Sequence, residues 1–90
     1  MKLFQIDEGY IVRSIGKLPK EIRSTYSVWR NILVNEGFKG LIREIKGFHF
    51  EKLRGERFGQ YSCRLNRGYR VIFVQEHNKT IVLEVNKHGY

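Results

Sequence analysis

The spacing of hydrophobic residues changes near Gly59. Before Gly59, apolar residues mostly recur at steps of three and four, which is typical of amphipathic helices. After Gly59 they alternate with polar residues, which is typical of strands with one buried face. Helices followed by strands predict an α+β domain, with the helices packed against a sheet.

Three helices are predicted before Gly59. The first covers residues 8–18, and Pro19 ends it or opens the next one. The second ends at Gly37, and a shorter third helix covers residues 38–47. The stripe of the second helix is predicted to lie in the core and consists of Ile22, Tyr26, Trp29 and Leu33.

Three strands are predicted after Gly59, at residues 61–66, 69–75 and 80–86. The turns between them are Asn66-Arg67-Gly68, in which Gly68 can take a positive φ, and Glu76-His77-Asn78-Lys79. In the first strand one face carries Tyr61, Cys63 and Leu65. In the last strand the core-facing set is Ile81, Leu83 and Val85, and the opposite set is Val82, Glu84 and Asn86.

The predicted fold is therefore α+β. A first strand within residues 2–7 lies at the edge of a small, mainly antiparallel sheet, which ends in a three-strand meander. Two to three helices pack on one face of this sheet and leave the other face bare.

The chain has 90 residues, enough for one domain, residues 1–90, and 41% of them are hydrophobic. Cys63 is the only cysteine, so no internal disulfide forms, and its alternating context predicts a small core residue. The N-terminus lacks the features of a signal peptide, and the apolar runs are too short to cross a bilayer. We expect a cytoplasmic protein with no membrane partner.

The formal net charge is +8. Residues 46–70 contain seven Lys or Arg and two Glu, so this segment carries +5 of the total. Basic clusters favour polyanions such as nucleic acid. The alternative is a solvated basic surface that keeps a small protein soluble, and net charge alone does not separate the two.

Alternation predicts that Arg64, Arg70 and His88 share the bare face of the sheet. Arginine binds phosphate through a planar fork of donors, and histidine exchanges protons near neutral pH. If Glu51 and His88 divide the roles of base and acid, such a set can cleave RNA through its 2′-OH without a metal or a protein nucleophile. Tyr90 follows if the chain stays extended, and could stack on a base.

These groups also have ordinary structural explanations. Glu51 would pair with Lys52 or Arg54 on the surface, and the two strand arginines would bind Glu84. The two residues near the C-terminus would be frayed. The other histidines show no ligand spacing, so no metal site is predicted.

Several segments together resemble the RelE/ParE superfamily of bacterial toxins, and its HigB-like and YoeB-like branches are nearest. The resemblance covers nearly the whole chain. The segments that carry it are Lys17-Leu18-Pro19, Glu51-Lys52-Leu53-Arg54-Gly55, Arg64-Leu65-Asn66, Tyr69-Arg70-Val71-Ile72-Phe73 and Lys87-His88-Gly89-Tyr90.

The resemblance implies the toxin of a type II toxin–antitoxin pair. Such toxins commonly enter the ribosomal A site and cut the mRNA codon there, and a cognate antitoxin silences them. No small-molecule cofactor is implied.

The resemblance also implies roles for individual residues. Glu51 matches a general-base candidate, Arg70 the arginine that stabilises the phosphorane, and His88 and Tyr90 the C-terminal acid and aromatic pair. Gly89 departs from the pattern, because many relatives carry an acidic residue there. The implied contacts to mRNA or ribosomal RNA phosphates come from Lys52, Arg54, Arg57, Arg64, Arg67 and Lys87.

Two alternatives remain open from the sequence. The ParE branch shares the fold but acts on DNA gyrase without cutting RNA, and it typically lacks the Glu, Arg and His set. A non-catalytic module that binds RNA or an antitoxin is the other alternative.

Overall fold

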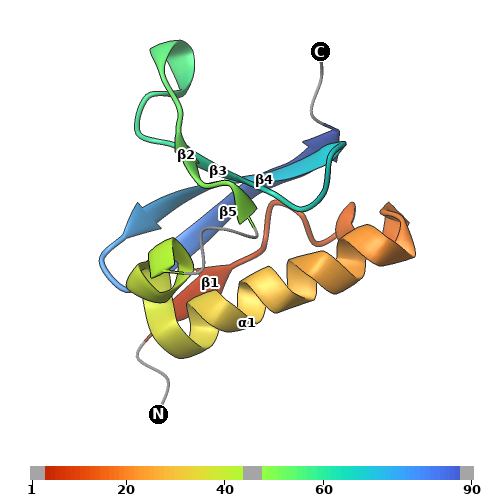
Figure 1. Ribbon diagram of the computed structural model, residues 1–90, viewed down its shortest axis with the longest axis horizontal. Helices are drawn as coiled ribbons and strands as arrows, with labels where there is room; N and C mark the ends of the chain where they lie inside the picture. The colour runs from red at the N-terminus through yellow and green to blue at the C-terminus, as the bar shows by residue number, and fades with distance from the viewer. Residues whose placement is uncertain (1–3, 44–47, 88–90) are drawn as a thin grey trace.

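The computed structural model describes residues 4–43 and 48–87. One long helix packs against a five-stranded mixed sheet with the strand order β1-β5-β4-β3-β2 (Figure 1). Strand β1 pairs in parallel with β5, and every other pair is antiparallel. The elements in chain order are β1 (Gln5–Asp7), η1 (Ile15–Lys17), α1 (Lys20–Arg43), β2 (Glu51–Lys52), η2 (Gly55–Arg57), β3 (Tyr61–Arg64), β4 (Tyr69–Glu76) and β5 (Lys79–Lys87).

This architecture confirms the predicted α+β class, the edge position of the first strand and the antiparallel meander β3-β4-β5. Helix α1 covers one face of the sheet, whereas η2 projects from the other (Figure 1). The two-residue strand β2 was not predicted, and it extends the sheet by pairing with β3. In the described part of the chain, no helix is both long and apolar enough to cross a membrane.

Helix α1 contains the second predicted helix and the third as far as Arg43, and residues 44–47 lie outside the described residues. It begins directly after Pro19, whose carbonyl accepts hydrogen bonds from the backbone N–H groups of Ile22 (3.0 Å) and Arg23 (3.1 Å). Gly37 interrupts it with φ 74° and ψ −172°, a conformation that glycine adopts without steric cost. The predicted break at Gly37 is thus a kink inside one continuous element.

The first predicted helix is wrong. Residues 8–18 form turns and the short 3₁₀ helix η1. Two glycines weaken so short a helix, while contacts with α1 fix another path. Glu8 accepts a hydrogen bond from the Tyr26 hydroxyl (2.6 Å) and pairs with Arg30 (2.9 Å), and Ile11 is buried in the core. Burial, and then the bond to Glu8, raise the pKa of Tyr26 above its usual range.

The core lies between α1 and the sheet. Trp29 and Phe73 are fully buried and meet edge to face, with ring centroids 5.2 Å apart. The whole predicted stripe of the second helix is buried, as is Cys63. Burial raises the pKa of the Cys63 thiol to about 12. These residues therefore serve packing, as their periodicity predicts.

The predicted alternation of the last strand is only partly right. The register moves from Ile72 opposite Glu84 to Phe73 opposite Val82, so Leu83 is an extra residue in a β-bulge. The residues buried on this strand are Thr80, Val82 and Val85. The bulge reverses the facing of residues before Leu83, so Val82 faces the core and Ile81 does not. Beyond the bulge the predicted facing of Glu84, Val85 and Asn86 is correct.

Both predicted turns are present. In the first, the Asn66 side chain accepts hydrogen bonds from the backbone N–H groups of Gly68 (2.7 Å) and Tyr69 (2.8 Å). The positive φ expected at Gly68 is not used, because this asparagine closes the turn. In the second turn it is His77 that takes a positive φ, of 50°.

Candidate active site on the uncovered face of the sheet

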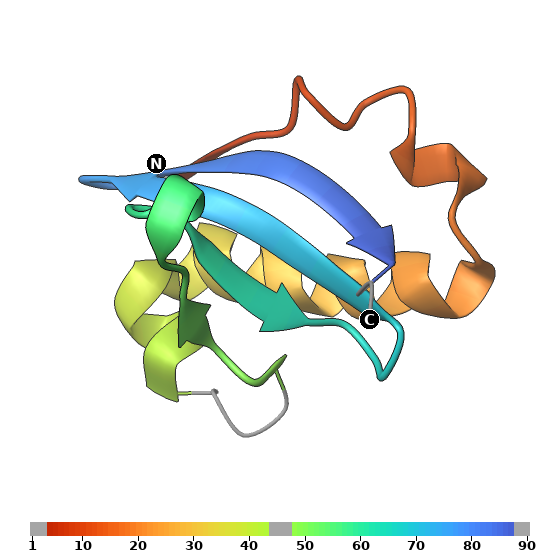
Figure 2. The ribbon, with the colours of Figure 1, turned by 90° about the horizontal axis from the view of Figure 1, so that it is seen from above.

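The strand pairing shows which side chains share the face that α1 leaves uncovered. Val71 and Phe73 on β4 belong to the core. Side chains alternate along a strand, so Arg70, the neighbour of Val71, points to the face that α1 leaves uncovered. Residues directly opposite in an antiparallel ladder point to the same face. Arg70 lies opposite Arg64 on β3 and opposite Asn86 on β5. We call these three residues the arginine row; the strands that carry them face the viewer in Figure 2.

The arginine row is electrostatically unusual. Like charges directly opposite each other on paired strands are destabilising, yet Arg64 faces Arg70. The Nε atoms of both are buried and have no hydrogen-bond partner among the described residues, and neither has the Oδ1 atom of Asn86. Buried polar atoms without partners cost free energy. Such a row is therefore poised to accept an anion with its own acceptor oxygens.

Arg64 and Arg70 do not bind Glu84, the carboxylate that was considered as their structural partner. Glu84 pairs with Arg57, with Nη2 and Oε2 3.3 Å apart, and it accepts a hydrogen bond from the Asn86 amide. The proposal that Arg64 and Arg70 are simply bound to Glu84 is thus wrong.

A second row runs beside the first, and its members pair across the sheet. Glu51 on β2 lies opposite Ser62, Ser62 opposite Ile72, and Ile72 opposite Glu84. Glu51 is exposed at the edge of the uncovered face. In the described ranges no ion pair joins it to Lys52 or Arg54, so its carboxylate is open to solvent.

The side chain of Arg57 spans the uncovered face. Its partner Glu84 lies on β5, so the contact crosses β3 and β4, which stand between β2 and β5 in the sheet. Ser62 and Ile72 point to this face and yet are only 5% and 0% exposed. Arg57 also donates to the Gln60 side chain (2.9 Å). An arginine from the β2–β3 connection is therefore held beside the arginine row.

The other predicted site residues are dispersed. Arg54 and Arg67 are exposed in the connections after β2 and β3. Lys52 and Lys87 lie opposite Tyr61 and Tyr69, which pack against the core, so both lysines belong to the helix-facing side. Their strands bring them near the row without placing them in it.

His88 and Tyr90 lie outside the described residues. Within residues 4–43 and 48–87 the structure thus brings together Arg64, Arg70, Arg57 and, one row away, Glu51. Sequence patterning placed Asn86 on this face without giving it a role. The Arg57–Glu84 contact was missed, because a link across 27 positions leaves no periodic signal.

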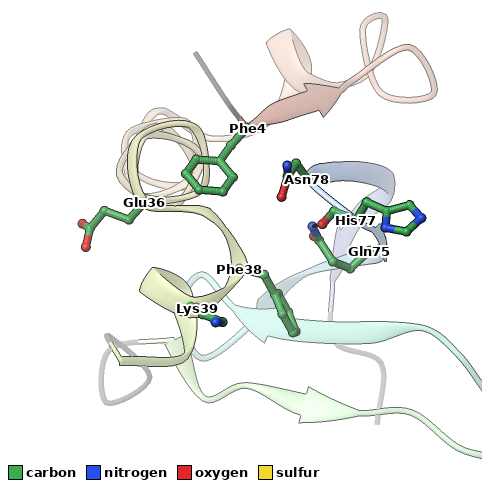
Figure 3. A pocket seen from close by; sticks show the side chains of 7 residues that line it. All are labelled: Phe4, Glu36, Phe38, Lys39, Gln75, His77 and Asn78. Atoms are coloured by element: carbon green, nitrogen blue, oxygen red, sulfur yellow. Dashed lines mark hydrogen bonds between the residues drawn. The ribbon is translucent and has the colours of Figure 1, made fainter. Parts of the chain in front are cut away.

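A pocket in the described part of the molecule lies away from these residues. A pocket of about 350 Å³ sits at the far end of β4, where the β4–β5 turn approaches the kink of α1 (Figure 3). The residues that line it are Phe4, Glu36, Phe38, Lys39, Gln75, His77 and Asn78. Phe4 and Phe38 make it mainly apolar, and none of the predicted site residues contributes to it. No group of three or more potential metal ligands occurs in the described part of the chain.

Solved structures share this fold along nearly the whole chain. The YoeB–YefM complex from Staphylococcus aureus matches with a TM-score of 0.66 at 16% identity, over 96% of this chain and 95% of that chain. The YoeB dimer from the same organism matches with a TM-score of 0.64 at 19% identity, over 97% and 98%. The chain has a YoeB-like fold.

At these identities the matches show a shared fold, and that fold agrees with the expected RelE-like architecture. No protein-family model and no curated protein matches the sequence. Within the described part of the chain, the arginine row and Glu51 lie on the face opposite α1, and the side chain of Arg57 reaches Glu84 across that face.

Proposed function

We propose that the protein is the toxin of a type II toxin–antitoxin system, acting as a ribosome-dependent mRNA endoribonuclease in the cytoplasm. The observation that carries this proposal is the arginine row, two opposed strand arginines with buried, unpartnered Nε atoms on the uncovered face. A phosphodiester supplies the acceptors that both guanidiniums lack.

The reaction proposed is cleavage through the ribose 2′-OH. A base removes the proton of this hydroxyl, its oxygen attacks the neighbouring phosphorus, and an acid protonates the departing 5′-oxygen. The negative charge that grows on the phosphorus-bound oxygens is stabilised by Arg70, with Arg64 beside it. The nucleophile belongs to the RNA, so the reaction needs neither a metal nor a nucleophile from the protein, and DNA is not a substrate.

Glu51 is the proposed base. It is exposed at the sheet edge, its row neighbours that of Arg70, and no described cation neutralises it. His88 as acid and Tyr90 as its aromatic companion rest on the family resemblance alone. Arg54, Arg57 and Arg67, together with Lys52 and Lys87, are proposed to hold phosphates of mRNA or ribosomal RNA.

The proposed protein partner is a cognate antitoxin. YoeB, whose fold the chain shares, is found in complex with YefM in two of the matching structures. We propose that a comparable small protein silences this chain.

Growth of bacteria that express the chain tests the proposal. Arg70→Ala should abolish growth arrest, because losing a donor that stabilises the transition state lowers the rate by about 10²–10³-fold. Arg23→Ala is the matched control, because it removes the same charge from an exposed position on α1 and should stay toxic. Undiminished toxicity of a folded Arg70→Ala variant would refute the role of the row, and DNA damage without RNA cleavage would favour gyrase as target.

A further inference from the structure

Phe58 is the most exposed large hydrophobic residue described, with 86% of its surface accessible. It follows directly after η2, on the loop that projects from the uncovered face of the sheet (Figure 1). Single exposed apolar residues are common on protein surfaces, so exposure alone assigns no role. What sets Phe58 apart is how firmly its loop is built and what surrounds it.

The loop that carries Phe58 has a defined shape. Gly55 and Gly59 adopt φ values of 65° and 91°, which L side chains rarely take. The backbone N–H of Phe58 donates to Gly55 (3.1 Å), and that of Gln60 donates to Arg57 (2.9 Å). The backbone that carries Phe58 is therefore held in one shape, so the cost of ordering this loop is already met in the free protein.

The loop is also tethered beside the proposed site. Arg57, the neighbour of Phe58, reaches Glu84 on β5 and Gln60 at the base of the loop. The connection to β2 places the loop at the sheet edge that carries Glu51, and the tether holds it against the uncovered face. A single strand of RNA bound along the uncovered face would meet Phe58 as it leaves this edge.

A hollow of about 200 Å³ adjoins Phe58, and its lining residues are Lys52, Leu53, Phe58, Gly59, Gln60 and Tyr61. Phe58 and Tyr61 are its aromatic residues, and Lys52 contributes an ammonium group. Because Lys52 and Tyr61 belong to the helix-facing side of β2 and β3, the hollow lies at the β2 edge of the sheet. Basic residues outnumber acidic ones along residues 52–60, with Lys52, Arg54 and Arg57 against Glu56. Positive charge around an exposed aromatic ring fits a nucleotide better than an apolar protein segment, because bases stack on such rings while their phosphates pair with the cations.

We propose that Phe58 stacks on one base of the bound mRNA codon, next to the linkage held by the arginine row. This inference rests on the proposed function and extends it by naming the residue that positions a flanking base. Phe58 would then influence where the RNA is cut, without taking part in proton transfer.

Cleavage of a defined mRNA on purified, programmed ribosomes tests this role. Phe58→Ala should lower kcat/KM by about fivefold to 150-fold, since stacking on an aromatic side chain contributes this range per base. Phe58→Trp should retain activity within about threefold, because it preserves the stacking surface. Val28→Ala, which trims another exposed apolar side chain on the outer side of α1, should cut like the wild type.

The deciding measurement replaces the bases of the codon one at a time by an abasic nucleotide. At the stacked position the abasic RNA should be cut equally slowly by the wild type and by Phe58→Ala, and at the other positions the difference between them should persist. A difference that persists at every position would overturn the inference. So would wild-type cleavage by Phe58→Ala, or normal cleavage combined with lost binding of a partner protein, which would assign Phe58 to a protein interface. If the wild type itself fails to cut, the proposed function falls, and this inference falls with it.

Discussion

Arg64 and Arg70 face each other across two antiparallel strands, and no carboxylate of the described residues pairs with them. An ordinary surface would place an opposite charge there, because like charges at this position cost free energy. A local rule broken without compensation inside the fold is typical of a functional site. The compensation proposed here is a phosphate group of the substrate.

If Arg57 holds an RNA phosphate as proposed, Glu84 competes with that phosphate for its guanidinium. Glu84→Gln should strengthen binding of the protein to ribosomes programmed with a non-cleavable mRNA by up to about fivefold. The limit follows because a half-exposed ion pair of this kind contributes at most ~1 kcal/mol. Freeing one arginine should also steepen the salt dependence of binding by about one phosphate contact. Glu76→Gln makes the same charge change at an exposed position away from the row and is the control. Equal gains from both variants would mean that net charge, and not release of Arg57, explains the effect.

Cys63 is predicted to be chemically silent in the folded protein. It is fully buried, and burial raises its pKa to about 12, so at pH 8 the thiol stays protonated and inaccessible. A thiol reagent at pH 8 should modify less than about a tenth of the protein within minutes, and all of it in 6–8 M urea. Rapid modification under native conditions would contradict the packing described for β3.

At the scale of elements, the best-predicted features were those with long, regular patterns. Helix α1 and strands β3 and β4 follow their periodicity, because burial of one stripe or one face outweighs other terms there. The helix predicted for residues 8–18 does not form, because the helical spacing of three apolar residues could not outweigh the contacts of Glu8 with Tyr26 and Arg30. The predicted facing of residues before Leu83 on β5 was wrong, because a bulge reverses which face the side chains point to. A strictly alternating pattern in the sequence does not reveal such a bulge.

The kink of α1 depends on Gly37. A Cβ atom at this position would lie 2.5 Å from the Phe4 ring, and φ is +74°. Gly37→Ala should therefore lower the free energy of unfolding by at least about 1–2 kcal/mol. Urea unfolding followed by the fluorescence of Trp29, the only tryptophan, measures this change.

Gly16→Ala is the matched control for that experiment. An added Cβ at Gly16 would have nothing within 4 Å, so its free energy of unfolding should stay within about 0.5 kcal/mol of the wild type. Equal stability of the two variants would show that the break in α1 does not require glycine.

For the whole molecule, sequence patterning predicted the α+β class, the meander and the shared face of Arg64 and Arg70. It could not predict β2 or the arm of Arg57 across the sheet, because both depend on contacts between residues far apart in the chain. The sequence named Glu51 as a site residue, but its place on the uncovered face follows only from its pairing with Ser62.

The molecule as a whole is a basic, YoeB-like chain with a net charge of +8 and one open sheet face. We propose that its charge favours a large polyanion such as the ribosome with its mRNA, and that the arginine row is the point at which one phosphodiester is held. The central claim is that this row is where RNA is cut.

Sequencing of RNA 5′ ends after brief induction tests that claim most directly. Cells expressing the wild type, or the control Arg23→Ala, should accumulate new 5′ ends within translated messages, in phase with codons. These ends should be absent from cells expressing a folded Arg70→Ala variant at the same level. Identical new ends in the wild type and in Arg70→Ala, or no new ends in growth-arrested wild-type cells, would contradict the account.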